Sequence, residues 1–350
     1  MKPSLLFYCQ HSVGLGHLMR SYALCEALTT RFDVTLLTGG DLPSGIAAPA
    51  DVELVALPPL GVQKNGFGTR GDESVERIWE LRHRRILMTL SRVQPTVVLV
   101  ELFPFGRAKF ARELVPLLEE ARSMGAFTAC SLRDILVRGD GDRDDRARRL
   151  ADEHLDAVFV HCDPSFARLE ETFKPSQPLG IPVHYTGFVA GRNGLNGHHR
   201  GEHIVVSAGG GRVGLPLLKE AMLASGGRPM RAIAGPLMPD DDYAQLQAIR
   251  PDNVELLRSV PNLAAELSQA AGSISQCGYN TALDLLRTRV PALVVPYAVD
   301  GEDEQTRRAR RLEHLGIVKV ADHADPALLD FTPEPARLDL DGAARTTELL

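Results

Sequence analysis

Two kinds of hydrophobic pattern alternate along the chain. Short, mainly apolar runs are each followed by a longer stretch in which apolar residues recur every three or four positions. The short runs suit strands buried on both faces, and the longer stretches suit amphipathic helices. The repetition therefore predicts an α/β protein with parallel sheets covered by helices. In the first half we expect strands at 5–9, 34–37, 52–56, 96–100, 126–131 and 157–161, and helices at 18–29, 73–92, 108–124, 144–154 and 164–172.

The pattern breaks at residues 187–200, where Gly, Asn and His replace the apolar periodicity. Such a stretch is typical of a linker. After it we expect strands at 203–207, 230–234, 254–257, 272–275 and 292–296, and helices at 214–224, 241–249, 262–270, 279–287 and 304–315. The predicted organisation is a first domain at 1–188, a linker at 189–202, a second domain at 203–330 and a tail at 331–350.

Two further segments do not follow the repeated pattern. The tail has weak periodicity, so it is expected either to form a loose helix that packs back on the first domain or to be partly disordered. Residues 57–71 form a long connection rich in Pro and Gly. Long connections in compact domains are often functional or mobile.

Length and composition agree with this organisation and exclude some functions. The 350 residues suit two domains, and 44% hydrophobic with 24% charged residues suits a globular protein with a full core. A formal net charge of -6 argues against nucleic-acid binding. The basic runs have helical spacing, which favours solvated helix faces.

The cysteines and the longest apolar runs bear on where the protein works. Five scattered cysteines without a Cys-x-x-Cys pair indicate buried, reduced thiols in a cytoplasmic protein. No apolar run is long enough for a signal peptide or a membrane span, so any membrane association should be peripheral. The oligomeric state is not indicated.

The first strand runs into a turn that contains Gly14, Gly16 and His17, and a helix follows. Glycines allow the backbone to approach a ligand closely, and the helix aims free N–H groups at it. The dinucleotide-binding fingerprint Gly-x-Gly-x-x-Gly is excluded because Met19 occupies its third position and the second strand ends without an acidic residue placed to hold a ribose. His17 lies where open α/β sheets bind ligands, and imidazole can take a proton from a hydroxyl. The alternative is a packing or capping histidine.

The second half contains two segments suited to a phosphorylated ligand. A strand ends at Ser207 and leads into Gly209, Gly210 and Gly211, which form a candidate anion cradle next to Arg212. No Gly-Lys-Ser/Thr follows, so this is not a Walker loop. The second segment follows the strand at 272–275 and opens a helix whose first turn favours a diphosphate. Its polar and glycine residues are Gln276, Gly278, Tyr279, Asn280, Thr281 and Asp284, with Glu304 and Gln305 at the start of the next helix.

At these residues the chain resembles the MurG-type glycosyltransferases and their bacterial predicted-glycosyltransferase relatives. The resemblance extends over residues 5–320 and is strongest at 14–17, at 278–284 with the strand at 291–296, and at 304–305. It implies a GT-B fold, in which two Rossmann-like domains with parallel sheets face each other across a cleft. The nucleotide sugar would bind mainly to the second domain, and the acceptor to the first.

The resemblance also implies roles for individual residues. His17 matches a functionally important histidine, Asp284 a ribose-binding acid, and Val260 a position whose backbone contacts the base. Glycines of both halves and the residues around them would hold the donor diphosphate, and a polar pair would hold its sugar. These donor-binding residues are Gly14, Gly16, Gly209, Gly210, Gly211, Arg212, Gln276, Gly278, Tyr279, Asn280 and Thr281, with Glu304 and Gln305 as the polar pair. The donor is expected to be UDP-N-acetylglucosamine or a UDP-hexose, and the acceptor is open.

The expected reaction is an inverting transfer without metal or resident cofactor. His17 is the first candidate for the base that deprotonates the acceptor, and Glu101, at the end of the strand 96–100, is the second. Asp134 is a third candidate. No Asp-x-Asp follows a strand at a suitable place, so helix N-termini and Arg212 are expected to stabilise the leaving diphosphate.

Three other functions remain open. Residues 14–20 also resemble the UDP-sugar hydrolases of pseudaminic acid synthesis, in which the matching histidine would activate water. A non-hydrolysing UDP-sugar epimerase shares the fold. A protein that binds a nucleotide sugar without catalysis is the alternative from a different class.

Overall fold

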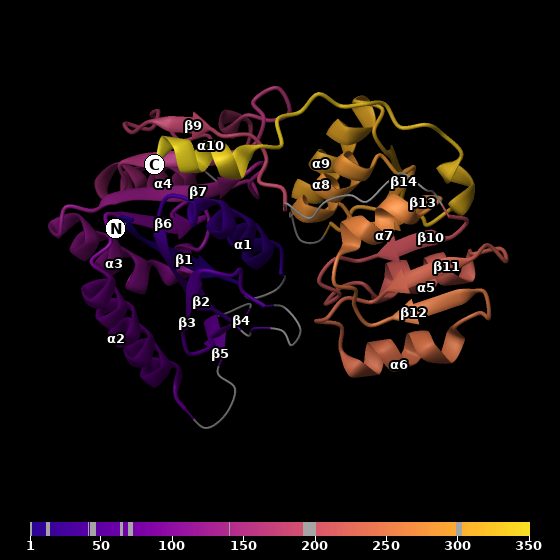
Figure 1. The fold of residues 1–350 in the computed structure, drawn as a ribbon, viewed down its shortest axis with the longest axis horizontal. Coiled ribbons are helices and arrows are strands. Elements are labelled where there is room, and N and C mark those ends of the chain that lie inside the picture. Colours follow the sequence, from indigo (N-terminus) through magenta and orange to yellow (C-terminus); the bar gives the residue numbers. More distant parts are fainter. Residues whose placement is uncertain are drawn as a thin grey trace.

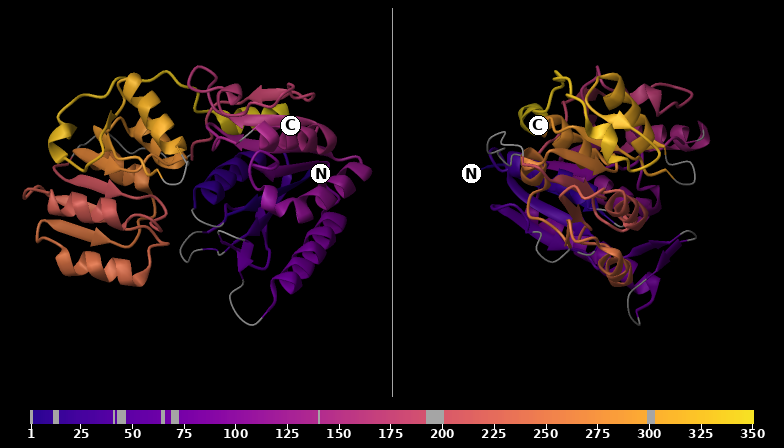
Figure 2. Two further views of the ribbon diagram at one scale, coloured as in Figure 1. Left: turned by 180° about the vertical axis from the view of Figure 1, so that it is seen from behind. Right: turned by 90° about the vertical axis from the view of Figure 1, so that its right-hand side faces the viewer.

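The computed structural model describes residues 2–11, 15–40, 42, 47–63, 66–68, 73–139, 141–191, 201–298 and 303–350. These residues form two parallel sheets, each covered by helices on both faces, and the two halves lie side by side (Figure 1). We call the first sheet with its helices the N-terminal lobe and the second the C-terminal lobe. Their separation is also visible from behind (Figure 2).

The sheet of the N-terminal lobe has seven parallel strands in the order β3-β2-β1-β6-β7-β8-β9. Helix α1 covers one face, and α2, α3 and α4 contribute to the core on the other. The strands are β1 (Ser4–Gln10), β2 (Asp33–Gly39), β3 (Val52–Ala56), β6 (Val97–Glu101), β7 (Phe127–Arg133), β8 (Ala157–His161) and β9 (Val183–Tyr185). The helices are α1 (Gly16–Leu28), α2 (Val75–Val93), α3 (Ala111–Ser123) and α4 (Gly141–His154).

The period of two in β1 explains how the two cores arise from one strand. Leu5 and Phe7 belong to the core beneath α1, whereas Leu6 and Tyr8 belong to the core beneath α2 and α3. Successive side chains of a strand point to opposite faces, so an uninterrupted apolar run is needed when both faces are covered.

The sheet of the C-terminal lobe has six parallel strands in the order β12-β11-β10-β13-β14-β15. The strands are β10 (Ile204–Ser207), β11 (Met230–Ile233), β12 (Val254–Leu257), β13 (Gly272–Ser275), β14 (Ala292–Val294) and β15 (Lys319–Val320). The helices are α5 (Leu215–Leu223), α6 (Asp240–Ile249), α7 (Leu263–Gln269), α8 (Tyr279–Thr288) and α9 (Glu304–His314). All five cysteines of the chain are buried and free.

The C-terminal tail returns to the N-terminal lobe. It crosses from the C-terminal lobe as an extended segment and ends in α10 (Gly342–Leu349), which lies over the sheet that contains β1 (Figure 1). Arg31, just beyond α1, donates to the carbonyl oxygen of Thr347 at 2.6 Å. The proposed linker at 189–202 falls largely on residues 192–200, which lie outside the described residues.

The prediction of a helix at residues 164–172 is wrong. This stretch forms a turn followed by a short 3-10 helix at Leu169–Glu171. Asp163 accepts hydrogen bonds from the backbone and hydroxyl of Ser165, and Glu171 accepts one from the backbone of Arg168. Side chains of this kind compete with helical backbone bonds and favour turns. The buried residues that gave the segment its helical spacing instead lie on a loop and pack into the core from there.

Some short strands were not anticipated. Residues 57–71 contain an antiparallel hairpin, β4 (Gly61–Gln63) and β5 (Gly66–Gly68), and the Phe67 ring packs edge-on against Trp79. β9 and β15 are also too short for a periodicity to reveal. Within the described part of the chain, no helix combines the length and apolar character needed to cross a membrane.

Each sheet contains one point at which the chain reverses its direction of strand addition. In the N-terminal lobe this point lies between β1 and β6, and in the C-terminal lobe between β10 and β13. Ligands of open α/β sheets bind beyond the carboxyl ends of the strands at such points. The topology therefore singles out the residues that follow β1, β6, β10 and β13.

Candidate active site

A histidine and a glutamate meet at the reversal point of the N-terminal lobe. His17 is the second residue of α1, and Glu101 is the last residue of β6. The His17 Nδ1 atom lies 2.6 Å from the Glu101 Oε1 atom. Because an ionised carboxylate only accepts, Nδ1 carries the proton and Nε2 keeps a lone pair. The pair thus has the form of an oriented general base.

Two arginines keep Glu101 ionised. Its side chain is fully buried and also accepts from Arg20, one helical turn after His17. Arg107 lies 3.7 Å from the other carboxylate oxygen. Burial alone would raise the pKa of Glu101, but His17, Arg20 and Arg107 together hold it well below its usual range.

The same surroundings keep His17 neutral. Burial lowers the pKa of the imidazole, Glu101 opposes this effect, and Arg107 and Arg20 add to it, which leaves a pKa of about 4. The side chain of His17 is still 20% exposed. At neutral pH the site therefore contains an uncharged, accessible imidazole backed by a carboxylate.

The glycine turn after β10 divides into a packed part and an open part. A Cβ atom on Gly211 would lie 2.2 Å from the carbonyl oxygen of Ala234, so this glycine is required by packing against the end of β11. Gly209 has a φ of +60°, and a Cβ atom there would have no neighbour within 4 Å. Only the open part of the turn, with Gly210 half-buried beside it, leaves room for a ligand. Arg212, next in the chain, is exposed.

The first turn of α8 faces the first turn of α1. Gly278 caps α8 with extended backbone and has open space where a Cβ would be. The Asn280 side chain donates to the carbonyl oxygen of Gly16 at 3.2 Å. The first N–H groups of a helix lack intrahelical partners and favour anions. A candidate anion site of the C-terminal lobe therefore lies beside the residue that precedes His17.

Tyr279 directs its side chain into the other lobe. Its hydroxyl donates to the His161 carbonyl oxygen at 3.1 Å and accepts from the Val189 backbone at 3.0 Å. The Arg20 guanidinium lies over its ring at 5.1 Å. Tyr279 can therefore meet a ligand through its backbone but not through its hydroxyl.

The remaining expected donor residues lie on the same side of the C-terminal sheet. Val260, after β12, and Asp284, on α8, are half-buried, and Thr281 is buried. The Gln276 amide contacts the Val213 carbonyl oxygen at 3.5 Å, so it links the turns after β13 and β10. Gly14 lies outside the described residues. No group of three or more His, Cys, Asp or Glu side chains capable of holding a metal was found among the residues that the structure describes.

Asp284 should make the stability of the protein depend on pH. Burial raises its pKa to about 7 from 3.8, with Arg287 opposing. The native state then binds more protons than the unfolded chain between about pH 4 and pH 7, so stability falls as pH rises through that window. Asp284→Asn should therefore raise the free energy of unfolding by about 1–3 kcal/mol at pH 8 and change it little near pH 4. Urea unfolding at both pH values, with exposed Asp252→Asn as control, measures this; equal effects at both would contradict it.

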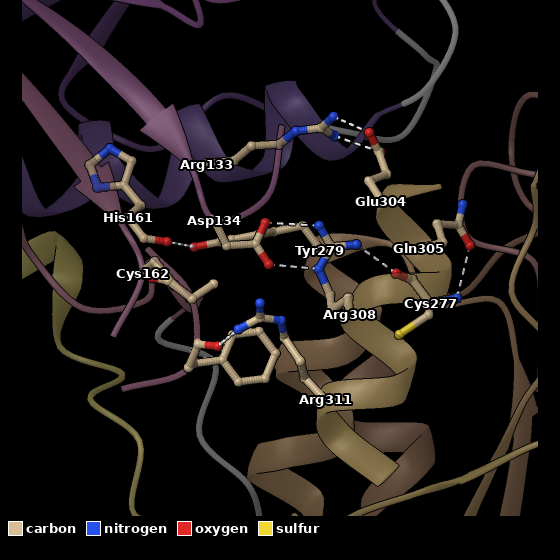
Figure 3. A network of polar contacts seen from close by, with 12 residues as sticks. Arg133, Asp134, His161, Cys162, Cys277, Tyr279, Glu304, Gln305, Arg308 and Arg311 are labelled. Carbon is tan, nitrogen blue, oxygen red and sulfur yellow. Dashed lines mark hydrogen bonds and ion pairs between the residues drawn. The ribbon is translucent and has the colours of Figure 1, made fainter. Parts of the chain in front are cut away.

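Within the residues that the structure describes, three ion pairs cross from the N-terminal lobe to α9: Asp134–Arg308 and Arg133–Glu304, which Figure 3 shows, and Glu171–Arg311. Asp134 binds Arg308 through both carboxylate oxygens at 2.7 and 2.8 Å, and both side chains are almost completely buried. Arg308 also donates to the Cys277 carbonyl oxygen at 2.7 Å. Asp134 is thus occupied by a contact between the lobes, and it is Glu101 that contacts His17.

The expected donor-sugar pair is also engaged. Glu304 binds Arg133, the last residue of β7, through both oxygens, one of them at 2.8 Å (Figure 3). The Gln305 side-chain oxygen accepts from the backbone N–H groups of Cys277 at 3.0 Å and Tyr297 at 3.2 Å. Gln305 therefore joins the turns after β13 and β14, whereas Glu304 reaches across to the N-terminal lobe.

Besides Arg107, sequence reasoning missed three arginines of this site. Arg20 lies three positions after His17, and residues three apart share a helix face. Arg308 likewise lies four positions after Glu304, and Arg133 ends a strand beside Asp134. These spacings were visible in the sequence, but the acidic partners of the three arginines lie 81 to 174 positions away from them.

Comparison with known proteins gave partial sequence matches. No family model matches the chain. A UDP-N-acetylglucosamine–N-acetylmuramyl-(pentapeptide) pyrophosphoryl-undecaprenol N-acetylglucosamine transferase of Synechococcus elongatus is 35% identical over 86 residues. The match covers 25% of this chain and only 23% of the relative. The sequence similarity is therefore confined to a segment.

Solved structures match over nearly the whole chain. A spinosyn rhamnosyltransferase aligns with a TM-score of 0.57 and 19% identity over 99% of this chain and 90% of its own. A Phytolacca americana protein complexed with UDP-2fluoro-glucose and pterostilbene aligns with a TM-score of 0.55 and 18% identity. The alignment covers 100% of this chain and 90% of that protein. The chain thus has the GT-B fold and is similar to MurG-type and other glycosyltransferases, as expected from its motifs.

Proposed function

We propose that this chain is an inverting glycosyltransferase that moves a sugar from a UDP-sugar to a hydroxyl of an acceptor. The observation that carries the proposal is the contact between Asn280 and the carbonyl of Gly16. It brings the start of α8 against the first turn of α1, the turn that carries His17. An anion-binding helix end and an oriented base therefore border the same space.

The donor diphosphate would lie against backbone N–H groups. The turn at Gly209 and the first turn of α8 at Gly278 both leave room for close approach. Helix N-termini favour negative charge, and exposed Arg212 adds a positive charge nearby. Asp284 would accept the ribose hydroxyls and Val260 would contact the base. The partial relative and one structural match are named for UDP-sugars, which supports uridine as the base.

His17 would act as the base. The acceptor hydroxyl oxygen bonds to the anomeric carbon as the bond from that carbon to the diphosphate oxygen breaks, and the hydroxyl proton passes to Nε2. Glu101 stabilises the imidazolium that forms. The bound diphosphate raises the pKa of the imidazole from its low value, because nearby negative charge favours the protonated form. Attack from the face opposite the diphosphate inverts the anomeric configuration.

The diphosphate leaves with its charge balanced by helix N-termini and arginine, so no metal is required. We expect transfer to continue at an unchanged rate, within about twofold, in excess EDTA. Release of UDP from UDP-N-acetylglucosamine and UDP-glucose, measured with a panel of hydroxyl acceptors with and without EDTA, tests this. Activity that disappears in EDTA and returns with Mg²⁺ or Mn²⁺ would contradict the metal-independent step.

The same assay separates the alternative functions. Free sugar released at full rate without an acceptor would identify a hydrolase, in which His17 activates water. Formation of the 2-epimer of the donor sugar would identify an epimerase. Donor that binds yet stays intact with every acceptor would indicate a binding protein without catalysis.

A further inference from the structure

The ion pair between Arg133 and Glu304, which we call the outer pair, differs from the buried ion pair between the lobes. The guanidinium holds both carboxylate oxygens, and the two side chains are 13% and 17% exposed. By contrast, the Asp134–Arg308 pair is almost completely buried and is reinforced by the Cys277 carbonyl. The buried pair and the Tyr279 hydroxyl already join the lobes. The outer pair is therefore not needed as their main connection.

The geometry of the outer pair leaves hydrogen-bonding capacity for a ligand. A carboxylate has about four lone-pair sites, and a bidentate guanidinium uses two. Glu304 can thus accept from two sugar hydroxyls while Arg133 holds it. The Nε atom of Arg133 is buried and has no hydrogen-bond partner in the described part of the chain. Both features indicate that this ion pair, which lies between the lobes, can form further hydrogen bonds.

The two members of the polar pair are held from opposite sides. Gln305 is fixed by backbone N–H groups of its own lobe. Glu304, its neighbour, binds a side chain of the other lobe, at the end of β7. A planar guanidinium fork fixes the orientation of a carboxylate, which a single ammonium does not. The direction of Glu304 is therefore set by Arg133.

We propose that Arg133 is a positioning residue that determines donor-sugar specificity. This inference rests on the proposed function. Arg133, in the N-terminal lobe, orients Glu304 toward the hydroxyls of the donor sugar. Recognition of the sugar then depends on a side chain of the N-terminal lobe, whereas the nucleotide is held mainly by the C-terminal lobe. Recognition of the nucleotide, at α8 and the Gly209 turn, does not depend on it.

Calorimetric titration with UDP and with UDP-N-acetylglucosamine and UDP-glucose tests this. The informative quantity is the ratio of the Kd for the UDP-sugar to the Kd for UDP. Arg133→Gln should raise this ratio about tenfold for the preferred sugar and leave the Kd for UDP within about twofold. Glu304→Gln should do the same, and the double variant should add little because both changes remove one unit. Arg133→Lys should lie between, and Arg310→Gln, which removes an exposed pair with Glu313 on the same helix, should change neither constant.

Each other outcome is decisive. An unchanged ratio in Arg133→Gln overturns the inference. Equal weakening of UDP and UDP-sugar, together with a lower melting temperature, also overturns it, because Arg133 would then only join the lobes. A wild-type protein that binds none of the three probes overturns the proposed function, and the inference with it. Wild-type binding combined with an unchanged ratio leaves the proposed function standing.

Discussion

Replacement of His17 by alanine is expected to slow sugar transfer by about 10²–10⁴-fold while the Kd for UDP stays within about twofold. The imidazole is the group that would take the acceptor proton, and its Nδ1 is committed to Glu101. Water replaces such a base poorly because it is neither oriented nor backed by a carboxylate. A loss of about 10³ corresponds to about 4 kcal/mol of transition-state stabilisation.

Initial rates at saturating donor and a titration with UDP measure the two effects separately. His314→Ala is a matched control, because His314 is an exposed histidine at the end of α9. It should leave rate and affinity unchanged. His17→Ala protein that keeps more than about a tenth of the wild-type rate would remove His17 from the role of base. A rate loss explained by weaker UDP binding would do so as well.

Replacement of Glu101 by glutamine is expected to reduce the rate nearly as much, by about 10²–10³-fold. The amide would turn its oxygen toward Arg20 and its NH₂ group toward Nδ1 of His17. The imidazole would then carry its proton on Nε2 and lose the lone pair that faces the acceptor. The charge that stabilises the imidazolium is also lost. Two facing arginines would remain without their counter-charge, which should lower the free energy of unfolding by about 3–5 kcal/mol.

A second buried glutamate separates the loss of activity from the loss of stability. Glu113 is 1% exposed and binds Arg82 at 2.6 and 2.9 Å in the core beneath α2 and α3. Glu113→Gln should destabilise the protein to a similar extent yet retain the wild-type rate per folded molecule. Rates at a temperature well below both transitions, with urea unfolding in parallel, test the comparison. Equal rate losses in the two variants would mean that Glu101 acts only through stability.

Most strands and helices followed from local pattern alone. β3, β8, β12 and β13 begin and end where the apolar runs predicted. Of these, β8 and β13 are buried along their whole length, as continuous apolar runs require, whereas β3 and β12 are partly exposed edge strands. The segment at 164–172 shows the limit of this reasoning. Its apolar spacing is helical, but Pro164 and the side chains of Asp163 and Glu171 favour turns. Local competition for backbone bonds outweighed the periodicity.

The candidate site followed from pattern only in part. Glycine turns after strands, and a histidine at the start of a helix, are local features, so Gly209, Gly278 and His17 were recognisable in the sequence. The sequence did not show that neighbouring glycines have different roles. Gly211 is required by its close packing against the end of β11, which only the structure reveals. Similarly, nothing local distinguishes Glu101 from Asp134 as the partner of His17. Only the strand order, which places β6 beside β1, distinguishes them.

The sequence by itself determined the α/β class, the repetition of strand and helix, and the residues of the glycine turns, because these depend on periodicity and on conformations that few residues adopt. The tertiary structure alone decided which charges meet. Arg20 binds Glu101, Arg308 binds Asp134 and Arg133 binds Glu304. Each of these pairs joins different elements, and the last two join different lobes. An ion pair depends on distance in space, which spacing along the chain does not fix until the strand order and the packing of the two lobes are set.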